Sequence, residues 1–575
     1  MGRRKGGFMT IYFDQHDPSS EKHDPSFGRP SVSGLDYSPL PRVTGRSLAM
    51  GCLVSFGGLI FGYDTGQISG FLEMPDFLDR FGLTHSDGTK YFSNVRAGLI
   101  VALLSIGTLF GALVAAPVAD KFGRKPSISF WALIVSIGFV IQIASVSAWY
   151  QLMIGRFVSG LGVGALSLLV PMYQAETAPA WIRGAMVCAY QLFITMGIWL
   201  AACFNYGTVK HQADNSGSWR IVIGLGWLWT IGLGVGILAF PETPRFDFRH
   251  GNEERAKQTI CRVFGATENH WAVHTQITEI ERKLRGESQI KNGPVKEFIT
   301  MFKAPRMAYR IALGMTLQML QQLTGANYFF YYGTTIFKSV QINSFVTQII
   351  LNSINFGVTF IGLYMVEHFG RRKSLIAGSI WMFICFMIFA SVGHFMLNLT
   401  DPAATPTPGI VLIVFACLFI LGFATTWGPM IWTIQAEIFP SRYRAKGMAL
   451  STASNWIWNF CIGFFTPFIT GAIDFRYGYV FAACNFLGAL VIYFFVIEGQ
   501  GRTLEEIDTM YLEHVLPWKS TKWVPPPPEH MANIRKKAGV DLDAIADQES
   551  DGPLAAAQYN KDLSSPEVPS HEEHV

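Results

Sequence analysis

Charged residues are scarce in this sequence. Asp, Glu, Lys and Arg together make up 15% of the 575 residues, whereas hydrophobic residues make up 50%. A soluble domain typically has about a quarter of its residues charged, so this balance excludes an ordinary water-soluble protein. The net charge of +4 is also small and lies in connecting segments rather than on one face. That distribution argues against a nucleic-acid partner.

Cysteine is rare and shows no recognisable spacing. None of the eight cysteines falls in a metal-binding or disulfide pattern, and most lie in apolar stretches, where we expect small buried side chains. No nucleophile with a matching base, phosphate-binding loop or metal-ligand cluster stands out. The sequence therefore predicts no enzyme, no metal and no other cofactor. The N-terminal 45 residues also lack the apolar core of a cleavable signal peptide.

Long apolar runs, in contrast, are abundant. A helix needs about 20 mostly apolar residues to cross a bilayer, and such runs follow one another through the middle of the chain. Their approximate bounds are 47–70, 96–119, 126–148, 152–172, 184–206, 221–241, 308–332, 344–366, 373–397, 409–437, 447–470 and 478–497. The sequence therefore predicts an all-α membrane protein with twelve transmembrane helices in a lipid bilayer.

Positive charges mark one side of these helices. Four short connections carry Lys and Arg residues, at 121–125, 183, 371–373 and 442–446. The positive-inside rule places such connections in the cytoplasm. Because the number of helices is even, both termini are then expected to be cytoplasmic.

A polar segment divides the chain into two six-helix halves. The predicted units are a cytoplasmic N-terminal tail (1–45), a first half (46–241), a cytoplasmic linker (242–307), a second half (308–497) and a cytoplasmic C-terminal tail (498–575). Within the linker, Glu253–Phe264 and Ile277–Arg285 have the pattern of short amphipathic helices. The Pro run and acidic end of the tail predict mostly disorder beyond Trp523.

Motifs rich in acids and arginine occur at matching places in both halves. They follow the second, fourth and sixth helix of each half, and the residues are Asp120, Arg124, Glu176, Arg183, Glu242 and Arg245 in the first half and Glu367, Arg371, Glu437, Arg444 and Glu498 in the second. Parallel halves are typical of alternating-access carriers. Carboxylate and guanidinium groups that pair in one state and separate in another would form a cytoplasmic gate. The alternative is that these charges only set the membrane topology.

One carboxyl group lies inside the first predicted helix. An acid at the centre of a spanning helix costs about 2.5 to 3.5 kcal/mol on insertion scales, so Asp64 needs a partner or a water-filled cavity. Arg156 in the fourth helix is the candidate partner. The pair is either a proton-coupling site, in which protonation of Asp64 releases Arg156, or a permanent structural ion pair.

Neutral amides form a second set of polar residues inside the predicted helices. They are Gln191, Gln321, Gln322, Asn327, Asn355, Asn455 and Asn459, and aromatic residues such as Tyr331, Tyr332, Trp432 and Trp456 lie near them in the sequence. Amides both donate and accept hydrogen bonds, as a neutral polyol requires, and aromatic rings can cover a sugar ring. Any single amide could instead join two helices. The set as a whole favours a sugar-like ligand.

Several exact motifs can be compared with known families. They include Gly62-Tyr63-Asp64-Thr65-Gly66, Asp120–Lys125, Pro241–Arg245, Gln321-Gln322-Leu323-Thr324-Gly325 and Asn455-Trp456. Together they resemble the sugar porter family of the major facilitator superfamily, and within it fungal hexose transporters, over roughly residues 47–512. The resemblance implies two pseudo-symmetric six-helix halves and transport of glucose or related hexoses across the plasma membrane.

The resemblance also implies roles for individual residues. Those that match sugar-contacting positions are Gln191, Gln321, Gln322, Asn327, Asn355, Trp432 and Asn455. Both proton symporters and facilitators of the family carry an acid at the position of Asp64, so protons are partners only if the chain is a symporter. The sequence departs from many relatives after the last helix, where Ile497-Glu498-Gly499 keeps the acid but lacks the usual Pro.

Two further predictions concern regions outside the helices. The alternative function is a transporter-like glucose sensor that signals through its C-terminal tail, although this tail shows no sequence repeat of the kind such sensors often carry. Asn398-Leu399-Thr400 matches a glycosylation acceptor in an outer connection.

Overall fold

The computed structural model describes residues 35, 36, 38, 40, 44–288, 294–338, 343–398, 405–440 and 442–538. The long helices are α1 (Gly45–Phe71), α3 (Asn94–Phe122), α4 (Arg124–Ile143), α5 (Trp149–Thr177), α6 (Ala180–Gln212), α7 (Gly217–Gly236), α12 (Met307–Leu323), α13 (Ala326–Phe337), α14 (Ser344–His368), α15 (Arg371–Phe395), α16 (Pro406–Gly422), α17 (Gly428–Ile438), α18 (Arg444–Ile473) and α19 (Tyr477–Phe495).

Shorter elements connect and extend these helices. They are α2 (Pro75–Phe81), strands β1 (Leu83–Thr84) and β2 (Lys90–Tyr91), η2 (Ile237–Ala239), α8 (Pro244–Arg249), α9 (Glu253–Phe264), α10 (Trp271–Ser288), α11 (Pro294–Lys303), η4 (Phe423–Trp427), η5 (Asp474–Arg476), α20 (Leu504–Leu512), η6 (Pro517–Lys522) and α21 (Pro528–Ala538). The two strands pair antiparallel through Leu83 with Tyr91 and Thr84 with Lys90. The molecule is thus almost entirely helical.

Each of the twelve predicted spans corresponds to a helix or a broken helix. In the described chain, ten segments are long and apolar enough to cross a membrane, and one of them, Arg444–Phe495, contains both α18 and α19. The seventh predicted span is split into α12 and α13, each shorter than a full span. The tenth is interrupted by the π-helical turn η4.

Local sequence explains where several helices begin and break. The hydroxyl group of Thr44 accepts a hydrogen bond from the N–H of Ser47 and caps α1, and Thr503 caps α20 in the same way with Glu506. Gly325 separates α12 from α13 with φ of +93°, a conformation that favours glycine. The amide of Asn485 donates to the carbonyl of Thr324 at this break (3.0 Å) and so satisfies a freed backbone oxygen.

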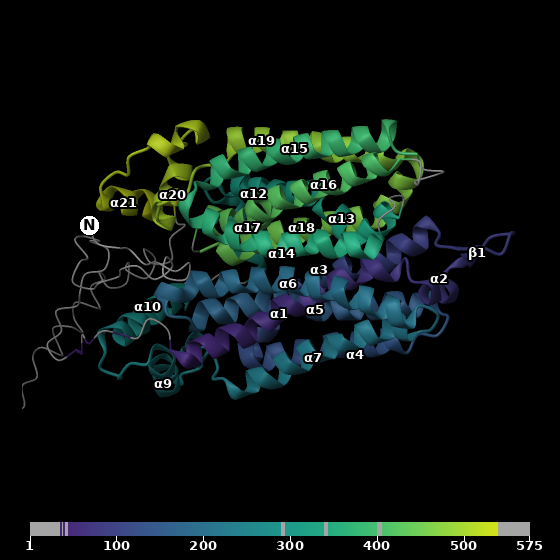
Figure 1. Ribbon diagram of the computed structural model, residues 1–575. Helices are drawn as coiled ribbons and strands as arrows, with labels where there is room; N and C mark the ends of the chain where they lie inside the picture. Colours follow the sequence, from purple (N-terminus) through teal and green to yellow (C-terminus); the bar gives the residue numbers. More distant parts are fainter. Residues whose placement is uncertain are drawn as a thin grey trace, which may run out of the picture.

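The spanning helices form two bundles that lie side by side, one coloured purple to blue-teal and one teal to yellow (Figure 1). In the first bundle α1 packs on α6, α4 on α5 and α4 on α7; in the second, α12 packs on α18, α15 on α16 and α15 on α19. These are the same pairs counted from the start of each half. The pairing therefore supports the predicted repeat.

The two halves join along α3 with α18, α6 with α14 and α1 with α13. Hydrogen bonds and one ion pair cross this interface. Ser69 of α1 contacts Thr334 of α13 through their hydroxyl groups (3.2 Å), and the Nζ of Lys338 lies 2.9 Å from a carboxylate oxygen of Glu73. Trp199 donates to Ser353 at 2.9 Å.

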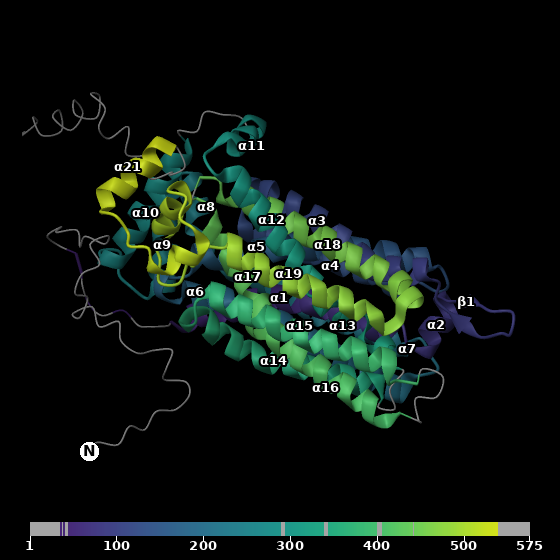
Figure 2. The same ribbon diagram turned by 90° about the horizontal axis from the view of Figure 1, so that it is seen from above.

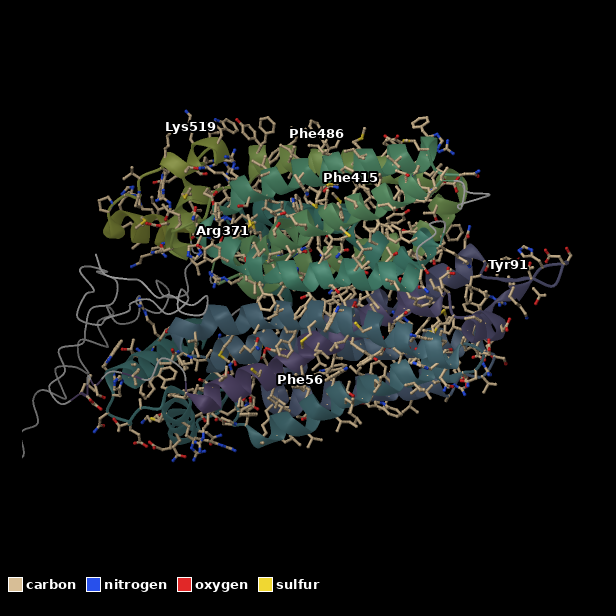
Figure 3. All side chains as sticks on the ribbon, in the orientation of Figure 1. Phe56, Tyr91, Arg371, Phe415, Phe486 and Lys519 are labelled. Atoms are coloured by element: carbon tan, nitrogen blue, oxygen red, sulfur yellow. The ribbon has the colours of Figure 1, made fainter. Side chains whose placement is uncertain are left out.

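Large apolar side chains face outward from the spanning helices. Leu133, Leu228, Val235 and Phe486 are each at least half exposed. Figure 3 shows Phe486 on the side of the second half that faces away from the first half. Water would penalise such a continuous apolar surface, whereas lipid would not. This surface fits a bilayer.

Short helices gather at one end of the molecule, opposite α2 and β1 (Figures 1 and 2). The linker contains four helices, α8 to α11, and α9 has the bounds predicted for the first amphipathic segment. Figure 3 shows Arg371 and Lys519 at this end and Tyr91 at the other. We call these the inner and outer ends.

The start of the C-terminal tail is more ordered than predicted. Helix α21 begins at Pro528, beyond Trp523, where we expected mostly disorder. Its Pro-rich start and the basic residues in its last turn both suit a helix. Helix α20 is anchored by Asp508, which pairs with the buried Arg310 of α12. Residues after 538 lie outside the described part of the chain.

Candidate functional site

Buried amides of the broken seventh span and of α18 form one hydrogen-bonded network. Gln322 donates to the Asn455 carbonyl oxygen (2.9 Å) and accepts from the Asn327 amide (2.5 Å). Asn455 in turn donates to Gln318 (2.7 Å) and Gln321 (2.9 Å). Asn327 is the second residue of α13, two residues after the Gly325 break, and its amide reaches back to Gln322 across this break.

The end of the π-helical turn η4 and the start of α17 supply backbone oxygens to this network. Gln321 donates to the backbone oxygens of Trp427 (2.9 Å) and Gly428 (3.1 Å). A π turn interrupts the regular hydrogen-bond ladder, and such turns frequently mark functional sites. Gln321 thus connects the network to the tenth span.

The network also reaches the first half. Asn459 accepts hydrogen bonds from Ser105 of α3 (2.6 Å) and from the Tyr331 hydroxyl (2.7 Å), and it donates to Gln322 at 3.4 Å. Ser105 is therefore the point where the first half contacts the amide network.

Three predicted sugar-binding residues lie outside this set of hydrogen bonds. Gln191 is half-buried on α6, and Asn355 is buried on α14. Trp432 of α17 has 36% of its surface exposed. An aromatic ring that is to stack on a ligand must be exposed to it, so this position is compatible with the predicted role.

Sequence reasoning missed other members of the network. Gln318 donates to Gln435 and accepts from Asn455, although it was not among the predicted residues. Its position one helical turn before Gln321 and Gln322 is the signal that could have identified it. Asn352, one turn before Asn355, is fully buried, and neither of its amide atoms has a partner in the described part of the structure. No pattern in the sequence distinguishes Ser105.

Asp64 and Arg156 form a completely buried ion pair in the first half. A guanidinium nitrogen (Nη1) of Arg156 lies 3.2 Å from Asp64 Oδ1, and both side chains are inaccessible. Gln67 donates to the same oxygen at 2.7 Å, and Ser159 donates to Oδ2 at 2.9 Å. The structure therefore brings the predicted partners together, and Asp64 accepts bonds from three side chains.

At the inner end of the first half, Arg124 lies between two acids. It forms a bidentate ion pair with Glu176 (3.1 and 3.2 Å), and Asp120 lies 3.1 Å away. Asp120 also pairs with Arg249 of α8 at 3.1 Å. Glu242 accepts hydrogen bonds from the backbone N–H groups of Arg124 (3.0 Å) and of the next residue (3.1 Å). Burial raises the pKa of Glu242, whereas these N–H bonds act in the opposite direction.

The second half repeats this arrangement. Arg371 pairs with Glu437 at 3.1 Å. Glu498 accepts from the backbone N–H groups of Arg371 (2.9 Å) and Arg372 (3.2 Å). Glu498 thus occupies the place of Glu242 although the usual Pro before it is absent.

The remaining gate residues lie near these sets. Arg444 donates to the backbone oxygen of Phe439 (3.2 Å), and Arg245 is the second residue of α8. The side chains of Arg183 on α6 and Glu367 on α14 lie outside the described part of the structure, as do Leu399 and Thr400 of the glycosylation motif. Among the described residues, no group of three His, Cys, Asp or Glu is arranged to hold a metal ion.

Comparisons with known proteins agree with this geometry. The family described as "Sugar (and other) transporter" matches residues 50–511. Hexose transporter 2 of Kluyveromyces lactis is 44% identical over 525 residues, which cover 90% of this chain and 91% of that protein. A low-affinity glucose transporter of Saccharomyces cerevisiae is 43% identical over 512 residues, covering 88% of this chain and 87% of that protein.

Solved structures give the same result for the fold. The inward-open xylose transporter XylE of E. coli matches with a TM-score of 0.66 and 26% identity, covering 81% of this chain and 99% of that one. The same coverage is found for that proton:xylose symporter bound to 6-bromo-6-deoxy-D-glucose. The matching halves, the repeated motifs and these relatives place the chain in the sugar transporter family, with the major facilitator fold and no enzymatic role.

Proposed function

We propose that this protein carries glucose and related hexoses across the plasma membrane by alternating access, with the sugar bound at the buried amide network of the second half. The observation that carries this proposal is that Gln321, Gln322, Asn327 and Asn455 converge on one another within the membrane. Relatives named hexose and glucose transporters support the choice of substrate.

The chemistry of the network suits a neutral polyol. Amide groups donate and accept, so they can exchange their mutual hydrogen bonds for bonds to sugar hydroxyl groups without leaving buried polar atoms unpaired. No net charge is required, and the nearest buried charges, Asp64 and Arg156, already pair with each other. We assign Trp432 as the ring that stacks on the sugar, with Gln191 and Asn355 as further contacts.

We infer that the described state faces inward. The bonds that join the halves include Ser69 with Thr334 and Glu73 with Lys338, close to the outer end, and Ser105 with Asn459 deeper in the molecule. The similar XylE structure is described as inward open. Closing the inner end would require the two caps around Arg124 and Arg371 to move relative to each other, which makes them the proposed gate. By the positive-inside rule the inner end and both termini are cytoplasmic.

Uptake of labelled glucose into proteoliposomes tests the proposal. We expect saturable uptake that unlabelled hexoses inhibit; an absence of uptake by folded protein would contradict the proposed function. Repeating the measurement with an imposed inward proton gradient distinguishes the two roles proposed for Asp64. Accumulation above equilibrium makes Asp64 a proton-coupling group, and simple equilibration makes it a structural partner of Arg156.

The sensor alternative is tested by removing 524–575 from the chain. Sugar uptake should be retained, because the proposed site lies within the membrane. If instead the truncation abolishes glucose-dependent signalling in the same cells while uptake is intact, the protein also acts as a sensor, and the proposed carrier function does not describe it fully.

A further inference from the structure

A hollow at the inner end of the first half is lined by cationic side chains from α4 and α9 and by apolar groups at the end of the sixth span. Its volume is about 400 Å³, and its lining includes Lys125, Arg255, Gln258, Thr259 and Arg262, together with the segment 238–241. None of the side chains that line it belongs to the proposed sugar site or to the gate, and Lys125 takes part in the gate only through its backbone N–H. Nothing in the transport cycle therefore accounts for the hollow.

The position of the hollow is set by two spanning helices. Lys125 is the second residue of α4, and the segment 238–241 begins at the end of the sixth span, Gly217–Ala239. Leu238 is 53% exposed and Phe240 is half-buried. The hollow thus lies where two helices leave the apolar layer, at the level of the lipid headgroups.

The side of the hollow opposite these two spanning helices is formed by α9. The opposite face of this helix is buried through Ala256, Ile260 and Val263. Arg255 and Arg262 are two turns apart and both exposed, so they point to the same side as the exposed Gln258. The buried Thr259 lies beside them and also lines the hollow. An amphipathic helix lying along a spanning bundle with arginines on its free face is a common arrangement at a membrane surface.

The three cations are not neutralised by ion pairs. Within the described part of the chain, no carboxylate lies within ion-pair distance of Lys125, Arg255 or Arg262. Asp247 of α8 interacts with Arg255 only at longer range; burial raises the pKa of its carboxyl, and the charge of Arg255 acts in the opposite direction. Glu242 is occupied by backbone N–H groups, including that of Lys125. The hollow is therefore positively charged.

The second half provides an internal comparison. Arg372 occupies the place of Lys125 in the repeat, but it is buried, donates to the backbone oxygen of Tyr493 (2.8 Å) and lies 4.9 Å from the centre of that ring. The guanidinium group of Arg372 is thus bound by groups of the protein itself. Lys125 has no such contact in the described structure, so at this position of the repeat the two halves present their cation differently.

We propose that this hollow binds the headgroup of an anionic phospholipid from the inner leaflet. The phosphate would accept hydrogen bonds from Lys125, Arg255 and Arg262, and the glycerol and first acyl carbons would contact Leu238 and Phe240. A free phosphate shares the first set of contacts but has no use for the apolar wall. Arginine and lysine clusters at this depth are suited to phosphate groups.

Native mass spectrometry of the full-length protein in detergent tests this site. Phosphatidylserine and phosphatidylcholine are titrated separately, and bound lipids are counted. We expect one tightly bound phosphatidylserine. The variant Lys125→Gln/Arg255→Gln/Arg262→Gln should bind it on the order of 100-fold more weakly, given the typical contribution of each basic residue near a lipid surface. The double variant Arg255→Gln/Arg262→Gln, which leaves α4 intact, should show about two thirds of this effect on a logarithmic scale.

The matched control removes three exposed lysines at the same end, Lys303→Gln/Lys519→Gln/Lys522→Gln, and should retain the lipid. Equal loss in both triple variants would mean that diffuse surface charge holds the lipid and would overturn the site. Tight binding of glycerol 3-phosphate or inorganic phosphate that displaces the lipid would overturn the lipid assignment. Wild-type protein that retains no phosphatidylserine would overturn the proposal, and glucose uptake by the same sample separates this result from a failure of the proposed function.

Discussion

At the inner end the two halves carry the same cap, whereas within the membrane they carry different chemistry. Arg124 with Glu176 and Glu242 corresponds to Arg371 with Glu437 and Glu498, in both partners and distances. Inside the membrane, the first half contains a buried ion pair and the second a network of neutral amides.

This difference separates two kinds of feature in a duplicated chain: those that the movement of the halves requires, and those that binding of the ligand requires. Both halves must rock against each other, so both keep the cap that fixes the inner ends of their helices. A sugar lacks the two-fold symmetry of the protein, so one half can supply most of its hydrogen bonds. The buried Asp64–Arg156 pair is then the feature by which the first half differs from the amide network of the second.

The largest expected effect comes from breaking that buried pair. Arg156→Ala leaves the Asp64 carboxylate unpaired at a site that is inaccessible to water, and breaking a buried pair typically costs about 3 to 5 kcal/mol. We expect a large fall in yield and in the thermal unfolding temperature of the purified protein.

The double variant Asp64→Asn/Arg156→Gln is the control for this effect. It removes both charges and should recover much of the lost stability, because neither residue is then buried as a lone ion. If Arg156→Ala alone is as stable as the wild type, the pair does not hold the first half together.

The matched caps predict the next largest effect. Arg124→Gln and Arg371→Gln remove charge-assisted bonds worth about 1.5 to 3 kcal/mol each, so we expect initial glucose uptake to fall roughly 10-fold in each variant. The two variants should be affected to a similar degree, because Arg124 and Arg371 make the matching ion pairs with Glu176 and Glu437. A normal rate in one variant and complete loss in the other would show that the caps are similar in structure but not in function.

A smaller effect separates the halves at the sugar site. Asn327→Ala removes a hydrogen bond to Gln322, and a bond worth about 1 kcal/mol corresponds to a rise in the KM for glucose of roughly 5- to 10-fold. Gln191→Ala in the first half is the matched comparison and should change the KM less. Membrane insertion, followed by surface labelling, should be unchanged in both. An unaltered KM in Asn327→Ala would remove that residue from the proposed site.

The repeated features were predictable from sequence, and the unrepeated ones largely were not. Span positions and the caps follow from hydrophobic runs and duplicated motifs. The Asp64–Arg156 pair is an unrepeated feature that was still predictable, because of the cost of a buried acid. The break at Gly325 and the π turn at 423–427 were not predicted, because a run of apolar residues does not reveal a local change in helix type. The Arg310–Asp508 anchor joins residues 198 positions apart, so no local pattern could reveal it.

The smallest expected effect concerns the outer contact between the halves. Lys338 is 70% exposed where it pairs with Glu73, and exposed pairs contribute about 0.2 to 1 kcal/mol. Lys338→Gln should therefore shift the balance away from the inward-facing state by no more than about fivefold. Hydrogen–deuterium exchange should speed up in the ends of α1 and α13, which Ser69 and Thr334 join, while Lys90→Gln on β2, also exposed and at the outer end, should leave it unchanged. High salt should reduce the difference between wild type and Lys338→Gln, because it screens an exposed ion pair; a difference that is independent of salt would mean that Lys338 acts through its packing rather than its charge.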